Sequence, residues 1–159
     1  MIEVREASDR RGTAGASRNG QHASVFLYTA WVLACVATLG SLFFGEVMGL
    51  PICTLCWYQR IFLYPLVFVL PAAILLRDRN VTYYALPLAV CGLAFAAYHN
   101  LLYYGILAKS ITPCTEAVPC TLRQIEWLGF VTIPLMSLAA FATILVCLLA
   151  YSIKYRRPE

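Results

Sequence analysis

Four long runs without a charged residue dominate the sequence: residues 25–45, 61–76, 81–108 and 129–153. The chain of 159 residues is 61% hydrophobic and only 13% charged, whereas soluble domains carry about 25% charged residues. A bilayer core about 30 Å thick needs roughly 20 helical residues. The second run reaches this length when Trp57–Arg60 are counted as its first turn. Because an open backbone in lipid leaves polar groups unsatisfied, we expect an all-α membrane protein, a bundle of four transmembrane helices.

One membrane domain accounts for most of the chain. Residues 1–24 are polar and rich in arginine, so we expect a disordered basic cytoplasmic tail there. Residues 25–153 form the four-helix domain, and residues 154–159 form a second cytoplasmic tail. The first apolar run exceeds the 7–15 residues of a signal-peptide core, which favours a signal anchor.

The basic residues are distributed unequally between the two sides that alternating helices define. Nine of the 12 lysines and arginines lie in the N-terminal tail, between the second and third runs, or after the fourth run. Only Arg60, Lys109 and Arg123 fall on the opposite side. Since cytoplasmic segments are enriched in Lys and Arg, we expect both termini to be cytoplasmic. The net charge of +4 reflects this topology and requires no nucleic-acid partner.

Two cysteine pairs lie on the side opposite the termini. Cys53 and Cys56 follow the turn-forming residues 49–51 at the start of the second helix. Unpaired N–H groups at a helix N-terminus favour thiolate, and this spacing is that of redox Cys-x-x-Cys motifs. Cys114 and Cys120 lie in a polar, proline-bounded loop before the fourth run. Both pairs are expected on the oxidising side, where disulfides persist, and we interpret both as redox centres.

Incidental loop cysteines and a metal site are the alternatives for these pairs. Structural zinc takes four ligands, typically from two closely spaced pairs. Cys114 and Cys120 lack that spacing, although the two pairs together could form a four-cysteine site. We expect no metal site. Three further cysteines lie inside apolar runs, where packing is the better interpretation: Cys35, Cys91 and Cys147.

Three polar residues near this end of the second and third runs are candidates for binding a cofactor head group. Arg60 follows Cys56 by four residues and therefore shares its helix face one turn deeper. An ionisable group at that depth is costly and indicates function, with snorkelling to the head groups as the alternative. Gln59 is placed to donate another hydrogen bond. His99 is either a buried, hydrogen-bonded histidine or a proton source for a reduced quinone.

Several motifs together resemble the DsbB/BdbC family of disulfide-bond formation proteins over residues 25–155. They are Cys53-Thr54-Leu55-Cys56-Trp57-Tyr58-Gln59-Arg60, the Cys114/Cys120 pair, Tyr98-His99, and Trp127-Leu128-Gly129-Phe130-Val131-Thr132-Ile133-Pro134. The five-residue spacing inside the second cysteine pair resembles the compact BdbC branch more than the DsbB branch.

The resemblance implies a thiol:quinone oxidoreductase of the bacterial inner membrane. Its partner would be a soluble or anchored thioredoxin-fold thiol oxidase of the DsbA/BdbD type, and its cofactor ubiquinone or menaquinone. Cys114 or Cys120 would accept attack by the partner thiolate, and Cys53 would exchange disulfide with this outer pair. Cys56 would face the quinone, with Arg60 holding its head. The alternatives are a vitamin-K-epoxide-reductase-like quinone enzyme and a non-enzymatic membrane adaptor with static extracellular disulfides.

The charge asymmetry predicts the orientation of the chain. A cytoplasmic reporter fused after Glu159 or inserted at Arg79 should be active, because both positions lie on the arginine-rich side. Activity assays of paired cytoplasmic and exported reporters at each position check this. Activity of the exported reporter at either position would contradict the orientation and the oxidising location of both cysteine pairs.

Overall fold

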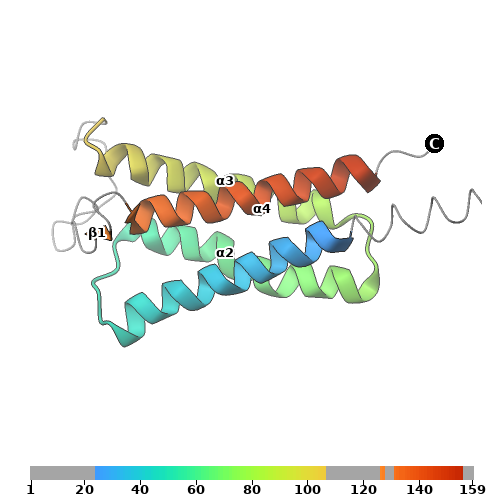
Figure 1. Cartoon of the computed structure of the whole chain (residues 1–159), viewed down its shortest axis with the longest axis horizontal. Helices are drawn as coiled ribbons and strands as arrows, with labels where there is room; N and C mark the ends of the chain where they lie inside the picture. Colours follow the sequence, from blue (N-terminus) through green and yellow to red (C-terminus); the bar gives the residue numbers. More distant parts are fainter. Residues whose placement is uncertain (1–23, 107–125, 128–130, 156–159) are drawn as a thin grey trace, which may run out of the picture.

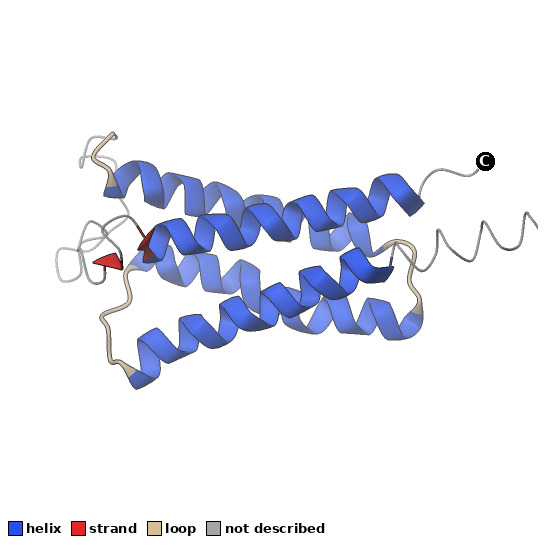
Figure 2. Ribbon diagram, viewed as in Figure 1, coloured by secondary structure: helices blue, strands red, loops and turns tan. Residues whose placement is uncertain are grey.

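The computed structural model describes residues 24–106, 126–127 and 131–155. Within these residues, four helices are long and apolar enough to cross a membrane. They are the first helix (Ser24–Val47), α2 (Thr54–Leu76), α3 (Val81–Tyr103) and α4 (Ile133–Tyr155). The helices run alternately in opposite directions (Figure 1), and helix dominates the described chain (Figure 2). The prediction of an all-α, four-helix membrane protein is confirmed.

Both ends of the described chain lie at the same end of the bundle, and the Cys-x-x-Cys motif lies at the other (Figure 1). This second end is called the cysteine end below. Two short strands, β1 (Glu126–Trp127) and β2 (Val131–Thr132), pair antiparallel there, with Glu126 opposite Thr132 (Figure 2). The expected N-terminal tail and the loop with Cys114 and Cys120 lie outside the described residues.

Local sequence signals explain where the helices end. The first helix closes in a π-helical turn, η1 (Phe43–Val47), and Gly49 then adopts a left-handed φ of 61° before α2 begins. Helix α3 ends at Tyr103, before the uncharged run does, because Gly105 takes a φ of 72°. The amides of Gly105 and Ile106 then bond back to two carbonyls of the last turn, as in a Schellman motif.

Helix α4 begins four residues later than its uncharged run. Val131 and Thr132 form strand β2, and the helix therefore begins at Ile133. The Thr132 hydroxyl accepts from the Leu135 amide at 3.4 Å, which satisfies one of the unpaired N–H groups of the first turn. Pro134 is tolerated there because first-turn amides have no intrahelical partner.

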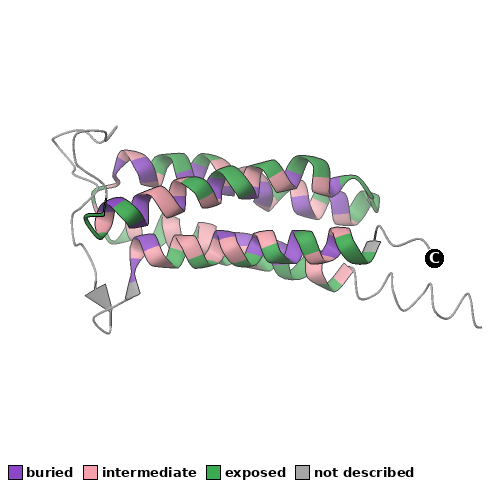
Figure 3. Cartoon of the chain, turned by 90° about the horizontal axis from the view of Figure 1, so that it is seen from above, coloured by how far each residue is buried: buried purple, intermediate pink, exposed green. Residues whose placement is uncertain are grey.

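The core of the bundle is apolar and closely packed. Buried and exposed residues alternate along the helices (Figure 3), as expected where one side of each helix packs against its neighbours. Small residues allow close approach, as expected where helices associate by packing and not by exclusion of water. The Phe141 ring of α4, 1% exposed, occupies the place where a Cβ on Gly92 of α3 would lie.

A proline inside α2 is compensated by a side chain of the first helix. Pro71 lacks the N–H that would bond to the carbonyl four residues earlier, on Val67. The indole Nε1 of Trp31 donates to that Val67 oxygen at 3.2 Å. In lipid an unsatisfied carbonyl is costly, so this contact both stabilises α2 and fixes the first helix against it.

Asn100 ties α3 to the start of α4. Its side chain is buried, and its Nδ2 donates to the Ala96 oxygen at 2.8 Å and to the Pro134 oxygen at 2.7 Å. The second bond crosses between helices at the cysteine end. Asn100 therefore fixes the position of the α4 N-terminus relative to α3.

Candidate functional site

The first two cysteines are held together by the start of α2. Cys53 is the N-cap residue, with extended backbone, and its sulfur accepts from the Cys56 amide at 3.4 Å. The two Sγ atoms are 2.9 Å apart, and both residues are free thiols. A disulfide needs about 2.05 Å, so oxidation of the pair requires a sulfur movement of only about 1 Å.

A histidine and a glutamine extend this pair into a buried polar cluster. His99 of α3 places its Nε2 3.8 Å from the Cys53 sulfur, and its Nδ1 lies 3.2 Å from Gln59 Nε2. Cys53, His99 and Gln59 are 6%, 3% and 7% exposed. Leu55 and Leu102 pack beside Cys53. The sequence had placed His99 at this end of its helix, and the fold brings it to the cysteines.

Neighbouring groups alter the acidity of Cys53, which precedes the α2 span. The hydrogen bond with the Cys56 thiol lowers the pKa of Cys53 from 9.0 to about 4. Desolvation by burial opposes this shift, and the hydrogen bond and charge of His99 act with the Cys56 hydrogen bond to lower the pKa of Cys53. A thiolate at Cys53 stabilises the reduced form of the pair, which makes its disulfide a stronger oxidant.

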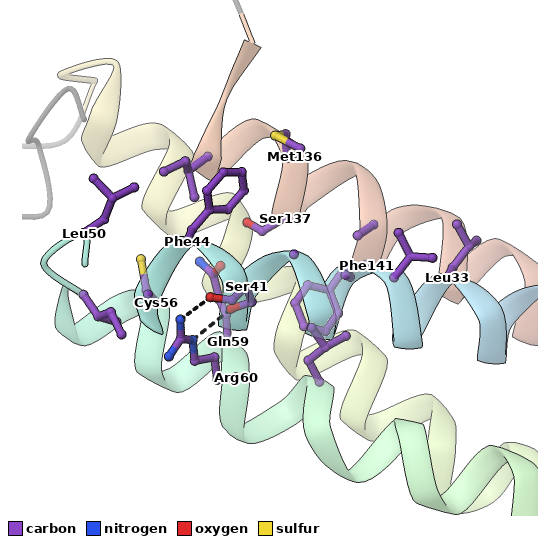
Figure 4. Close-up of a pocket in the computed structure, with 18 of the residues that line it drawn as sticks. Leu33, Ser41, Phe44, Leu50, Cys56, Gln59, Arg60, Met136, Ser137 and Phe141 are labelled. Atoms are coloured by element: carbon purple, nitrogen blue, oxygen red, sulfur yellow. Dashed lines mark hydrogen bonds between the residues drawn. The ribbon is translucent and has the colours of Figure 1, made fainter. Parts of the chain in front are cut away.

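A cavity of about 390 Å³ opens beside the other cysteine. It lies between the first helix, α2, α4 and the connection at residues 50–52, and most of its walls are apolar. Cys56, Gln59 and Arg60 line it near Ser41, whereas Leu33 lies toward its far end (Figure 4). Leu33 and Gly45 of the first helix both line it, which gives it a length of about 18 Å at 1.5 Å per residue.

Arg60 is buried and fixed by the first helix. The residue is 6% exposed, its Nε donates to Ser41 Oγ at 2.8 Å, and its Nη2 donates to the Ser41 carbonyl at 2.5 Å (Figure 4). Gly45 permits this approach, because a Cβ there would lie 2.7 Å from Nη2. Trp57 lies under the guanidinium at 5.6 Å. The side chain therefore packs against the first helix inside the bundle.

The structure brings together five of the seven residues that the sequence singled out. Cys114 and Cys120 lie outside the described residues. His99 contacts Cys53 and Gln59 but does not line the cavity. Ser41 was missed by sequence reasoning, although a serine between Gly40 and Gly45 in an apolar run could have marked a close polar approach between helices.

Comparison with known proteins decides the family. Residues 23–151 match the family model of the disulfide bond formation protein DsbB. The chain belongs to this family. It is 45% identical over 127 residues to disulfide bond formation protein C of Bacillus subtilis, a match covering 79% of this chain and 92% of that protein. The probable disulfide formation protein of Metapseudomonas resinovorans is 44% identical over 131 residues, covering 82% of this chain and 90% of the relative.

These matches confirm the resemblance to the DsbB/BdbC family, with the relative named disulfide bond formation protein C on the BdbC side. Together with the four apolar helices, they make the chain a multi-pass membrane protein of disulfide formation, a disulfide-forming oxidoreductase. No solved structure gives a significant match.

The contacts of Cys53 predict its titration. The reduced protein should carry a Cys53 thiolate at neutral pH and lose it as the pH falls toward about 4. Because this pKa lies below the ordinary value of 9.0, its contribution to stability of the reduced fold is complete above pH 9.0 and is lost as the pH falls through about 4. Thiolate ultraviolet absorbance measured against pH checks this.

The matched variants separate the two causes of the shift. Cys53→Ser should remove the low-pH absorbance step. Cys56→Ala should move the step toward 9.0 by more than His99→Ala does, because the Cys56 hydrogen bond is the larger cause. A wild-type step only near 9.0 would contradict the assignment.

Proposed function

We propose that this protein is a thiol:quinone oxidoreductase that reoxidises an extracytoplasmic thioredoxin-fold thiol oxidase and passes the electrons to a membrane quinone. The observation that carries the proposal is that the two cysteines of the Cys-x-x-Cys motif have different surroundings. Cys53 faces His99 of α3, whereas Cys56 lines the apolar cavity. We therefore assign Cys53 to disulfide exchange and Cys56 to electron transfer into the membrane.

The cavity fits a quinone by the chemistry of its walls. An apolar chamber with a few convergent polar groups is typical of small-molecule sites. Here the polar groups are Cys56, Gln59, the Arg60–Ser41 contact and, from α4, Ser137 (Figure 4). The apolar length beyond them suits an isoprenoid tail. Ubiquinone and menaquinone share this chemistry.

The cysteines would carry two electrons in sequence. The partner's two thiols are oxidised to a disulfide while the Cys114–Cys120 disulfide is reduced to two thiols. These then reduce a Cys53–Cys56 disulfide by exchange through a mixed disulfide. Re-forming the Cys53–Cys56 disulfide from two thiols releases two electrons and two protons, which a quinone held beside Cys56 would accept to become the quinol.

The polar residues would assist this exchange from fixed positions. Arg60 has five N–H donors, and Nε and Nη2 already donate to Ser41. Within the described residues Nη1 has no protein acceptor, so it is the donor we assign to a ligand oxygen. His99 is placed to hold or move a proton at Cys53, and Gln59 both orients His99 and lines the cavity.

This proposal places the cysteine end of the bundle outside the cytoplasm and both termini inside, as the distribution of Lys and Arg predicts. Both cysteine pairs then meet the oxidising compartment. The family match favours this function over the vitamin-K-epoxide-reductase-like enzyme and the static adaptor.

The partner reaction can be tested by trapping. One of Cys114→Ser or Cys120→Ser should accumulate a mixed disulfide with a thioredoxin-fold protein, because the neighbouring thiol needed for resolution is missing. Non-reducing electrophoresis followed by mass spectrometry detects the adduct. Cys91→Ser, on the exposed side of α3, should form none. If neither single variant affects oxidation of the partner, the proposed order of transfer is wrong.

The quinone step can be tested at Arg60. Arg60→Ala should raise the apparent KM for quinone or slow its reduction, because a charge-assisted hydrogen bond worth about 1.5–3 kcal/mol is lost. That corresponds to about one to two decades in affinity or rate. Steady-state quinone reduction by purified variants measures this loss, and Arg60→Lys should recover only part of it, since a point charge does not replace the planar fork.

Two further variants serve as comparisons for Arg60→Ala, one with a smaller expected effect and one with none. Ser41→Ala removes the acceptor of Nε but keeps the carbonyl, so it should have a smaller effect than Arg60→Ala. Arg79→Ala, at the opposite end of the bundle, should leave the kinetics unchanged. Disulfide exchange between the two cysteine pairs should survive in all of these variants. Unchanged kinetics in Arg60→Ala would remove Arg60 from the quinone site.

A further inference from the structure

The two thiols and the histidine form a cluster with the composition of a metal site. The sulfurs of Cys53 and Cys56 and a ring nitrogen of His99 all lie within 4.8 Å of one another. We propose that, in the reduced protein, these three side chains bind a soft divalent cation, Zn²⁺ above all, and that the bound cation holds the pair reduced. The sequence alone predicts no metal site, because Cys114 and Cys120 lack the spacing of a zinc-binding pair and nothing local brings His99 to Cys53 and Cys56.

The geometry is close to that of a tetrahedral site. Zinc takes sulfur at about 2.3 Å and nitrogen at about 2.0–2.1 Å, which separates ligand sulfur and nitrogen by about 3.5 Å and two sulfurs by about 3.8 Å. Cys53 Sγ and His99 Nε2 are already 3.8 Å apart. The sulfurs, at 2.9 Å, need to separate by about 1 Å, which a side-chain rotation at half-buried Cys56 supplies. Three protein ligands and one open position are the pattern of catalytic zinc.

Gln59 supplies the support that a metal-bound histidine needs. When Nε2 binds a metal, Nδ1 carries the proton and donates it to an acceptor, which is a strong determinant of metal affinity. The Gln59 amide lies 3.2 Å from Nδ1. Because the amide has an oxygen and a nitrogen in equivalent positions, turning it over presents an acceptor to Nδ1–H without moving the helices.

The charge balance suits a buried site. Binding requires both sulfurs as thiolates, and any thiol proton passes to solvent, so that Zn²⁺ and two thiolates together are neutral and desolvation costs little. No electron is transferred. A Cys53–Cys56 disulfide has no thiolates to offer, so the cation and the oxidised state exclude each other. Hard cations such as Mg²⁺ prefer oxygen ligands and should not compete.

The binding test uses full-length protein carrying Cys114→Ser and Cys120→Ser, so that the outer pair cannot contribute ligands. Protein reduced with a phosphine and purified in detergent is titrated with Zn²⁺ against a chromophoric chelator. We expect one equivalent to bind to the reduced protein and none to the oxidised protein, a comparison that needs no site variant. Co²⁺ in place of Zn²⁺ should give a thiolate-to-metal charge-transfer band.

Single substitutions then identify the ligands. Cys56→Ser should abolish binding, and His99→Ala should weaken it by more than Gln59→Leu, for which a loss of about 10- to 100-fold is expected. Cys91→Ser, on the same helix as His99, should bind as the parent does. Equal binding by reduced and oxidised protein, or full affinity in His99→Ala, would overturn the site.

The effect on turnover is the only part that rests on the proposed function. Zn²⁺ should slow quinone reduction by otherwise wild-type protein, and a chelator should restore it. Metal binding without inhibition would overturn the claim that the cation holds the pair reduced. Binding in a protein that reduces no quinone even without metal would refute the proposed function and leave the metal site standing.

Discussion

The demand of lipid that every backbone carbonyl find a donor shapes this bundle. Pro71 leaves the Val67 oxygen without its helical donor, and Trp31 of the first helix provides one. Nearer the cysteine end the donor lies on α2 and the acceptors on the first helix, since Arg60 donates to the carbonyl and hydroxyl of Ser41. These two contacts fix the first helix against α2 at two levels. The cavity beside Cys56 exists because the helices are held there while small residues line its wall.

The polar cluster gains its properties from its apolar setting. Hydrogen bonds are electrostatically stronger in a medium of low dielectric constant, and unpaired polar groups there are correspondingly costly. Cys53, His99 and Gln59 satisfy one another across two helices. Asn100 fixes the neighbouring start of α4, which carries part of the cavity wall. The polar groups of the site are therefore held by contacts between different helices.

The two sulfurs of the Cys-x-x-Cys motif lie in different environments, although they are only three residues apart in the sequence. Cys53 caps the start of α2 and meets His99, whereas Cys56 lines the cavity. A thiolate at Cys53 suits both disulfide exchange and the binding of a soft cation, because both require a deprotonated sulfur. Redox transfer and metal binding are thus competing uses of one cluster, and the oxidation state of the pair selects between them.

Three features can be read from the sequence alone: the number of helices, the position of Cys53 and Cys56 at the start of α2, and the shared face of Cys56 and Arg60. These follow from apolar run length and from helical periodicity, which are local properties. The sequence did not determine that Arg60 bonds to Ser41, that His99 reaches Cys53 and not the cavity, or that α3 ends at Gly105 inside its uncharged run. Those features depend on the rotation and separation of helices distant in the sequence, which packing and the pairing of buried polar groups decide only in the folded bundle.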